Sequence, residues 1–232
     1  MLPDKWRTPP WTLTTTGQPD RAGSDRARSG VTPPAAGDEP RRSNVFLIGG
    51  YAGSGKSELA RVLSRLTGAA IIDKDTITRP VVERLLKDLD RPAHDRESQT
   101  YLEQVRPHEY EALLATIQEN ADMGVGVIAT APFIREFHDS AWIERMSTRL
   151  DAAGVGLTVV WVRCDATTMH TYLKRRGAAR DTGKLVDWND YIAGIDLEFK
   201  PAADHVIIDN SASSEPLQSQ ASKMLATIAA AA

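Results

Sequence analysis

The stretch from Val45 to Ala60, VFLIGGYAGSGKSELA, constrains the fold of this chain more than any other. A short apolar run, as expected of a central strand in a parallel sheet, leads into a loop with four glycines. The residues that follow have apolar side chains at helical spacing: Leu59, Val62, Leu63 and Leu66. The stretch therefore predicts a strand, a tight glycine loop and a helix in direct succession.

The glycine loop matches the pattern G-x-x-x-x-G-K-[ST] at Gly50, Gly55, Lys56 and Ser57. Glycines let successive backbone N–H groups converge on one anion, and the start of the helix adds its positive dipole end. Lys56 supplies an ammonium for the β- and γ-phosphates, and Ser57 offers a hydroxyl to Mg²⁺. The loop thus predicts binding of ATP with Mg²⁺, through Gly50, Ala52, Gly53, Ser54, Gly55, Lys56, Ser57 and Glu58.

Strand and helix patterns alternate through the rest of the chain. Further strands are predicted within 69–73, 125–133, 155–164 and 204–209, and helices over 142–152, 166–176 and 217–228. A long helical region covers 81–120, broken at Arg91-Pro92 and Arg106-Pro107, and Asp187 is expected to cap a helix whose apolar face reaches Phe199. This alternation predicts an α/β fold with a five-stranded parallel sheet covered on both faces.

Residues 1–43 differ in composition from the rest, because they hold seven of the 13 prolines and no sustained apolar periodicity. We expect a disordered N-terminal extension, in which Trp6 and Trp11 are the exceptions, followed by one domain over 44–232. The formal net charge of −3 argues against a non-specific nucleic-acid or membrane-surface binder. The single cysteine, Cys164, excludes an intrachain disulfide and is interpreted as a small buried hydrophobe. Without an apolar run long enough to span a membrane, a cytoplasmic location is expected.

The second predicted strand ends in IIDKDTITRP, which places Asp73 and Asp75 at the edge of the sheet where ligands bind in open parallel sheets. Alternation along an extended segment would point both carboxylates the same way and Lys74 the opposite way. A carboxylate there can accept the proton of a hydroxyl that attacks the γ-phosphate. We assign that role to Asp75, and expect Asp73 to order Mg²⁺-bound water or a substrate hydroxyl; helix capping is the alternative for either.

These motifs together resemble the P-loop small-molecule kinases, a group that includes shikimate and gluconate kinases, chloramphenicol phosphotransferase and the kinase domain of polynucleotide kinase. The resemblance covers about residues 44–211 and rests on the glycine loop, on DKDTI and on the stretch RPHEYEALLATIQENADMGVGVIATAPF. It implies a three-layer P-loop kinase fold, an acceptor cover over 81–120 and a lid over 175–185. It also implies that Asp75 is the general base. Many relatives carry an acidic residue in or after the third strand, where this chain has Ala129, Thr130 and Ala131.

The segment YLKRRGAARDTGKLVDW concentrates positive charge: it carries Lys174, Arg175, Arg176, Arg180 and Lys184, with Gly177 and Gly183 as possible hinges. Cationic side chains on a closing segment stabilise the charge that spreads over a transferring phosphoryl group. By resemblance, Arg176 and Arg180 are the lid arginines that act on the phosphates, and Asp181 is expected to orient Arg180 through a bidentate pair. A solvated, charged helix end is the alternative interpretation.

Acceptor contacts are expected from Arg106, Thr130 and Arg135, whereas Tyr172 and Trp188 are interpreted as core residues. The five histidines show no metal-ligand spacing. The sequence thus predicts an ATP-dependent phosphotransferase, an enzyme that acts on a hydroxyl of a small molecule. By resemblance, the acceptor could be an antibiotic of the chloramphenicol or capuramycin type, which would make the enzyme a resistance kinase. Two alternatives stay open: a polynucleotide 5′-hydroxyl kinase, which the acidic segment 83–111 disfavours, and a toxin or nucleotide-gated regulator.

Overall fold

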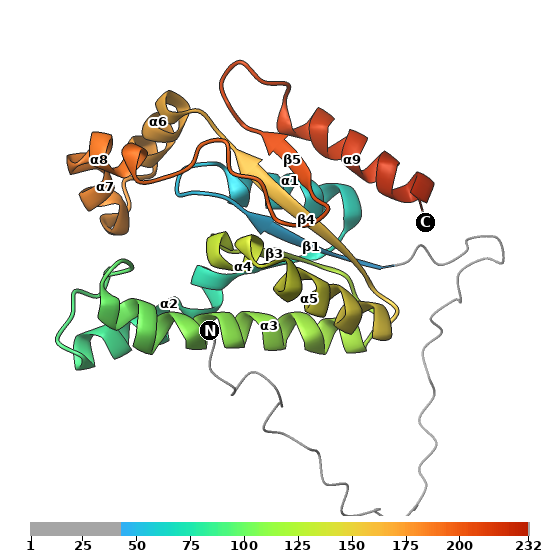
Figure 1. Cartoon of the computed structure of the whole chain (residues 1–232), viewed down its shortest axis with the longest axis horizontal. Helices are drawn as coiled ribbons and strands as arrows, with labels where there is room; N and C mark the ends of the chain where they lie inside the picture. Colours follow the sequence, from blue (N-terminus) through green and yellow to red (C-terminus); the bar gives the residue numbers. More distant parts are fainter. Residues whose placement is uncertain (1–42, 232) are drawn as a thin grey trace, which may run out of the picture. The chain divides into compact units, whose positions relative to one another are not determined.

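The structure is a computed structural model that describes residues 43–231. The predicted N-terminal extension, with Trp6 and Trp11, therefore lies outside the described residues except for Ser43. Five strands form one sheet in the order β2-β3-β1-β4-β5, and every neighbouring pair is parallel (Figure 1). Their bounds are β1 Asn44–Gly49, β2 Ala70–Asp73, β3 Val127–Thr130, β4 Gly156–Arg163 and β5 Val206–Asp209. The predicted five-stranded parallel sheet is confirmed.

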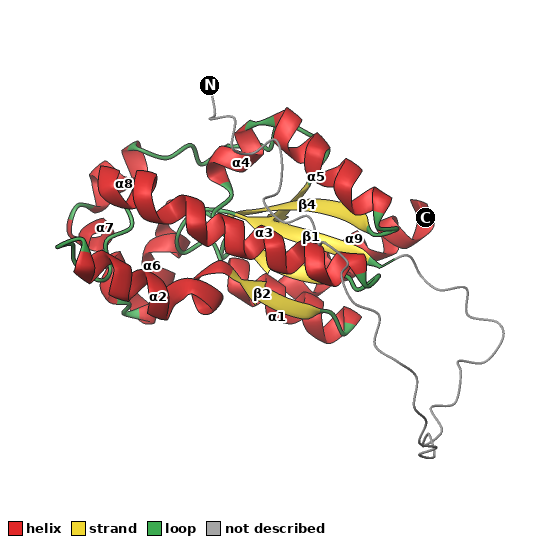
Figure 2. Cartoon of the chain, turned by 90° about the horizontal axis from the view of Figure 1, so that it is seen from below, coloured by secondary structure: helices red, strands yellow, loops and turns green. Residues whose placement is uncertain are grey.

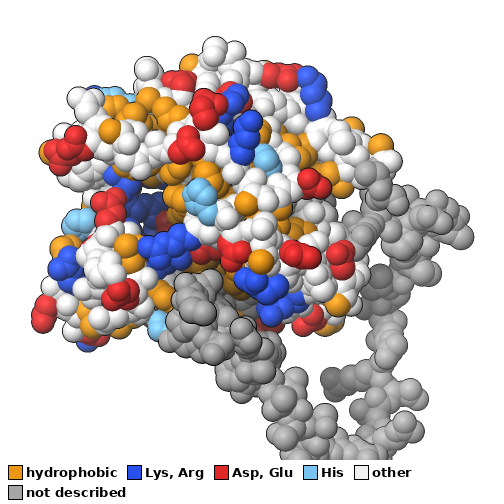
Figure 3. Space-filling view, in the orientation of Figure 1, with side chains coloured by type: hydrophobic (Ala, Val, Ile, Leu, Met, Phe, Trp, Pro, Cys, Tyr) orange, Lys and Arg blue, Asp and Glu red, His pale blue; other side chains and the backbone are white. Residues whose placement is uncertain are grey.

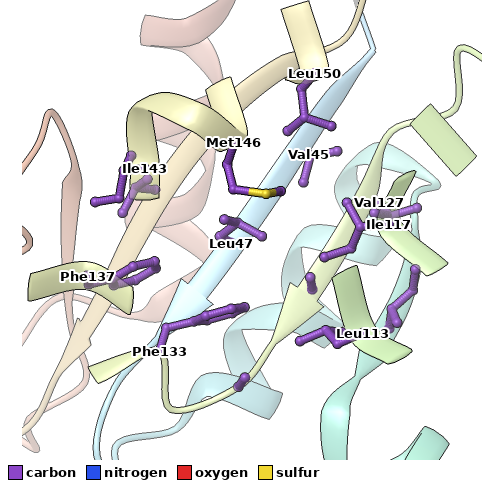
Figure 4. Close-up of a cluster of buried hydrophobic side chains, with 14 of the residues drawn as sticks. Val45, Leu47, Leu113, Ile117, Val127, Phe133, Phe137, Ile143, Met146 and Leu150 are labelled. Atoms are coloured by element: carbon purple, nitrogen blue, oxygen red, sulfur yellow. The ribbon is translucent and has the colours of Figure 1, made fainter. Parts of the chain in front are cut away.

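Helices cover both faces of this sheet because β1 buries side chains on both sides. Val45 and Leu47 pack on one face against α3 (Arg106–Asp122), α4 (Ile134–His138) and α5 (Ser140–Ala152), as Figure 4 shows. Phe46 and Ile48 pack on the other face against α1 (Lys56–Thr67) and α9 (Leu217–Ala231). The result is the predicted three-layer arrangement, with α3 lying across one face of the sheet in Figure 2.

The predicted cover over 81–120 is built from α2 (Lys74–Asp88), a loop, the π-helical turn η2 (Tyr101–Val105) and α3. Two expectations about it were wrong. The first helix begins at Lys74, directly after β2, and the chain does not break at Arg106-Pro107. Pro107 occupies the first turn of α3, where its missing N–H costs no helical hydrogen bond. Val82, Leu86, Tyr101 and Val105 form a small separate core that holds α2 against η2.

The segment 175–185, predicted to be a lid, spans the end of α6 (Ala166–Arg176), the single 3₁₀ turn η3 (Ala179–Asp181) and most of α7 (Thr182–Val186), and α8 (Trp188–Ala193) follows it. Gly177 ends α6 in the left-handed conformation, with φ of 60°, as expected at a helix C-terminus. The helix expected to start at Asp187 and reach Phe199 is shorter than predicted, and the side chain of Asp187 makes no capping hydrogen bond. Phe199 instead packs on Trp161 of β4, with ring centroids 4.4 Å apart.

Candidate active site

A cleft of about 1590 Å³ opens at the carboxyl ends of β1, β2 and β3. The glycine loop and the start of α1 form one wall, the cover forms a second and the lid a third. Figure 3 shows this hollow between the cover and the lid, with basic side chains in its depth. Most of the predicted site residues line it: Ala52, Gly53, Gly55, Lys56, Ser57, Glu58, Asp73, Asp75, Arg106, Thr130, Arg135, Arg176 and Arg180.

The glycine loop is held in shape by contacts within the protein. The Lys56 ammonium donates hydrogen bonds to the carbonyl oxygens of Gly50 and Tyr51, at 2.7 and 2.8 Å. Gly55 immediately precedes α1 with φ of 98°, and a Cβ there would lie 2.1 Å from the Asn210 amide nitrogen. Asn210 in turn donates to the carbonyl oxygen of Ser54, at 3.0 Å. Any side chain at position 55 would therefore displace Asn210, which explains the glycine.

Four charged side chains of the cleft act electrostatically on the Lys56 ammonium. Burial lowers the pKa of Lys56 to about 8, and the positive charge of Arg176 contributes to the lowering. The carboxylates of Asp75 and Asp73 act in the opposite direction, and Arg180 lowers the pKa further. These four side chains belong to α2, its N-cap and the lid, so folding brings the predicted donor-side and acceptor-side charges within electrostatic reach of one ammonium.

Asp73 caps α2 rather than pointing freely into the cleft. Its carboxylate accepts hydrogen bonds from the backbone N–H of Thr76, at 2.9 Å, and from the hydroxyl of Thr130, at 2.5 Å. The capping alternative is therefore confirmed for this residue. The bond to Thr130 joins the end of β2 to the end of β3 at the floor of the cleft.

Asp75 lies in the first turn of α2, so the expected alternation with Lys74 was wrong. Because successive residues of a helix are about 100° apart, Lys74 can reach its neighbour, and its ammonium lies 3.0 Å from the Asp75 carboxylate. The Arg180 guanidinium of the lid donates to the other carboxylate oxygen. Burial alone would raise the pKa of Asp75, but the positive charges of Lys74 and Arg180 outweigh it and hold that pKa below its usual value.

Within the lid, the expected pairing of Asp181 with Arg180 was wrong as well. Asp181, which is buried, accepts two hydrogen bonds from Arg176, at 2.8 and 2.7 Å. This bidentate pair spans the end of α6 and η3, and it leaves Arg180 free to reach Asp75 across the cleft. Tyr172 on α6, expected in the core, is 37 % exposed and lines the cleft beside Arg176.

The wall formed by the predicted acceptor cover carries more positive charge than the acidic composition of the segment 83–111 suggested. One guanidinium nitrogen of Arg106 donates to both carboxylate oxygens of Glu136, at 2.8 and 2.9 Å, and the guanidinium lies 4.0 Å from the centroid of the Tyr110 ring. Arg96 also lines the cleft, with its guanidinium 5.4 Å from the centroid of the Tyr101 ring. The cleft-facing residues of the segment 83–111 are Arg96, Glu97, Tyr101, Leu102, Arg106 and Tyr110. Most of its acidic side chains therefore face elsewhere, which weakens the argument against a polyanionic acceptor.

Several residues in the cleft or buried behind it carried no recognisable signal in the sequence. Lys74 and Glu109 form a buried ion pair at 2.8 Å. Tyr191 of α8 lines the cleft and is half-buried, and burial raises its pKa.

Cys164 is buried as expected, and burial raises the pKa of its thiol to about 12, which makes it a poor nucleophile.

The donor set of the cleft fits a magnesium nucleotide. Oxygen ligands suit Mg²⁺, and the Ser57 hydroxyl, which lines the cleft in the first turn of α1, is a ligand of that kind. Within residues 43–231, no group of three or more histidine, cysteine or acidic side chains could hold a metal ion. No helix in that range is long and apolar enough to cross a membrane.

The AAA domain family has a sequence profile that matches residues 45–194, from the start of β1 to the end of α8. The chain belongs to the AAA domain family. This AAA domain has no match among curated proteins. Its described strands and helices have the three-layer P-loop kinase fold.

Solved structures similar to this AAA domain include several kinases. A putative kinase from Chloroflexus aurantiacus matches with a TM-score of 0.57 and 13 % identity, over 80 % of this chain and 98 % of that one. A sugar kinase from Janibacter sp. HTCC2649 has a TM-score of 0.52 and 16 % identity, over 79 % and 93 % of the two chains. A gluconokinase from Sinorhizobium meliloti 1021 has a TM-score of 0.51 and 15 % identity, over 83 % and 95 %. At these identities the likeness concerns the fold alone.

Proposed function

We propose that this protein transfers the terminal phosphoryl group of ATP to a hydroxyl of a small molecule. The observation that carries the proposal is the placement of Lys56 and Asp75 in one cleft, which Arg176 and Arg180 also line. A phosphate-binding loop opposite an ionised carboxylate suits in-line phosphoryl transfer. The hydroxyl attacks the phosphorus on the side opposite the leaving group, and the carboxylate accepts the proton that this hydroxyl loses.

On the donor side, the glycine loop would bind the phosphates through its backbone N–H groups and the start of α1. Lys56 would exchange its two carbonyl partners for phosphate oxygens, and Arg176 and Arg180 would close over the transferring group. The hydroxyl of Ser57 would hold Mg²⁺, with Asp73 orienting a bound water; the ion neutralises phosphate charge when present. Tyr172, exposed beside Arg176, offers a ring face to the nucleotide base.

On the acceptor side, Asp75 would receive the proton of the attacking hydroxyl. Tyr101 and Tyr110 supply ring surface to the cleft, and Arg96, Arg106 and Arg135 supply positive charge. Arg106 is already paired with Glu136, whereas neither Arg96 nor Arg135 has an ion pair with a carboxylate among those found in residues 43–231. An acceptor that carries an anionic group near its reactive hydroxyl fits this wall better than a neutral one.

The test is a transfer screen with radiolabelled ATP against matched hydroxyl acceptors, comparing sugar acids and sugar phosphates with the parent neutral sugars. Chloramphenicol, a nucleoside antibiotic and an oligonucleotide 5′-hydroxyl complete the panel. Asp75→Asn should reduce kcat by about 10²–10⁴-fold while the Kd for ATP changes less than threefold. Tight ATP binding with no transfer to any acceptor would favour the nucleotide-gated regulator instead. Measurable transfer by Asp75→Asn at the wild-type rate would remove Asp75 from the mechanism.

A further inference from the structure

Two oppositely charged side chains lie buried behind Asp75. Lys74 is 3 % exposed and Glu109 is 2 % exposed, although they come from different helices, α2 and α3. Their charged groups lie 2.8 Å apart. Charged side chains are almost never buried this completely unless they are paired, so the pair requires a structural or functional explanation.

Glu109 is fixed by three side chains from two elements, α2 and η2. One carboxylate oxygen accepts from the hydroxyl of Thr78, at 3.0 Å, as well as from Lys74. The other oxygen accepts from the hydroxyl of Tyr101 in η2. Glu109 therefore has partners on both oxygens, and it cannot rotate without breaking contacts to α2 and η2.

Lys74 in turn connects this fixed carboxylate to Asp75. Its ammonium lies 2.8 Å from Glu109 and 3.0 Å from Asp75, so both contacts are at ion-pair distance. The second cationic partner of Asp75, Arg180, is different in kind, because its side chain is 26 % exposed and belongs to the lid. Asp75 thus has one partner anchored in the core and one on the partly exposed turn η3.

We propose that Lys74, anchored by Glu109, is a positioning residue that keeps the Asp75 carboxylate oriented and ionised when Arg180 turns to the phosphoryl group. This inference rests on the proposed function, because it assumes that Asp75 receives the proton of the acceptor hydroxyl. It assigns Lys74 no contact with substrate. If Lys74 were absent, Asp75 would lose its other close cationic partner when Arg180 turns to the phosphoryl group.

The charged groups around Asp75 make the expected effects of substitution opposite in sign. Four cations act on Asp75: Lys74 on its own helix, Arg180 from the lid, Arg96 from the loop before η2 and Lys56 from α1. Two further charged residues lie nearby in the chain: Asp73 at the N-cap of α2 and Arg79 within α2. Lys74→Met removes the nearest cation but leaves Asp75 buried, so the pKa of Asp75 should rise. Glu109→Gln removes the negative charge that partly cancels Lys74, so that pKa should fall further.

The test titrates Asp75 by carbon-13 NMR in the full-length, nucleotide-free protein, with Asp75→Asn used to assign its signal. Lys74→Met should raise the Asp75 midpoint and Glu109→Gln should lower it, each enough to change the ionised fraction severalfold at fixed pH. Thr78→Val is the matched control, since it removes a hydrogen bond to Glu109 without changing a charge. Lys74→Arg, which keeps the charge, should restore the wild-type midpoint.

The acid limb of the pH profile of kcat/KM should move with the NMR midpoint in each variant, while the Kd for ATP stays within about threefold. Identical Asp75 midpoints in the folded variants, or shifts in the same direction for Lys74→Met and Glu109→Gln, would overturn the inference. The two proposals fail separately. If the midpoints shift as expected and no acceptor is phosphorylated, Lys74 still positions Asp75 and only the proposed reaction is wrong.

Discussion

The Arg180 guanidinium donates a hydrogen bond to the carboxylate of Asp75, which lies 105 residues earlier in the chain. This contact joins the lid to the cover across the mouth of the cleft. Since both groups face the space next to the glycine loop, nucleotide phosphates would compete with Asp75 for Arg180. The predicted lid and the proposed general base are therefore in direct contact.

Arg180→Gln should break this coupling. Without the guanidinium, the pKa of Asp75 in the nucleotide-free protein should rise, because Arg180 is one of the two main charges that lower it. Transfer should fall by about 10³-fold, since a cation that acts on the phosphoryl group is lost. Stopped-time assays at saturating ATP measure kcat. Lys174→Gln, exposed on the same lid and outside the cleft lining, should retain wild-type kcat; equal losses in both variants would contradict the assignment.

Asp181→Asn should weaken the attachment of Arg176 to the lid. The buried carboxylate binds Arg176 through two hydrogen bonds, and an amide can accept only one of them. We expect the KM for ATP to rise about tenfold and trypsin to cleave the segment 175–187 faster. Asp187→Asn is the matched control, because Asp187 is exposed and its side chain makes no capping bond. An unchanged KM and cleavage rate would show that Arg176 needs no partner.

ATP affinity should decrease above pH 8. The pKa of Lys56 is about 8 in the free protein, and bound phosphates should raise it, so binding above that pH requires uptake of a proton. Affinity should therefore be nearly constant below pH 8 and fall by up to tenfold per pH unit above it. Calorimetry between pH 6.5 and 9.5, in buffers of different ionisation enthalpy, counts the protons. A Lys56→Arg variant should bind without this pH dependence, and a flat wild-type profile would rule out the lysine titration.

Arg135→Gln should affect the acceptor alone. Arg135 lines the cleft at the start of α4, away from the glycine loop in sequence, and its charge suits an anionic group on the acceptor. The KM for an anionic acceptor should rise about tenfold, with the Kd for ATP unchanged. Arg149→Gln on α5, which is exposed and outside the cleft, provides the control. If ATP binding weakens instead, Arg135 belongs to the nucleotide side.

Local sequence patterns predicted the scaffold well. The strand, loop and helix around Gly50 to Ser57 are specified by neighbours in the chain, and the remaining strands follow from short apolar runs. The predicted orientation of Lys74 relative to Asp75 was wrong because the strand ends at Asp73, two residues before the end of the assumed alternation. In a helix, a residue's neighbours are set by a rotation of about 100°, so Lys74 reaches the carboxylate beside it.

Long-range pairs were beyond the reach of such patterns. Nothing in the sequence around Lys74 indicates that Glu109, on another helix, would neutralise it in the core. The choice of partner for Asp181 was equally open, because Arg176 and Arg180 are both close in sequence and only the turn after Gly177 decides between them. Roles of single charged residues therefore needed the folded chain, whereas the binding loop did not.

The strand order sets the width of the reaction space. The glycine loop leaves β1 and Asp75 follows β2, with β3 alone between them, and strands lie about 4.8 Å apart. Two such steps, roughly 10 Å, leave room for one phosphoryl group and the oxygen that attacks it. Thr130, at the end of β3, is the floor of that gap. A bulkier side chain at this one position would reduce the space between the glycine loop and Asp75 and would break the hydrogen bond to Asp73.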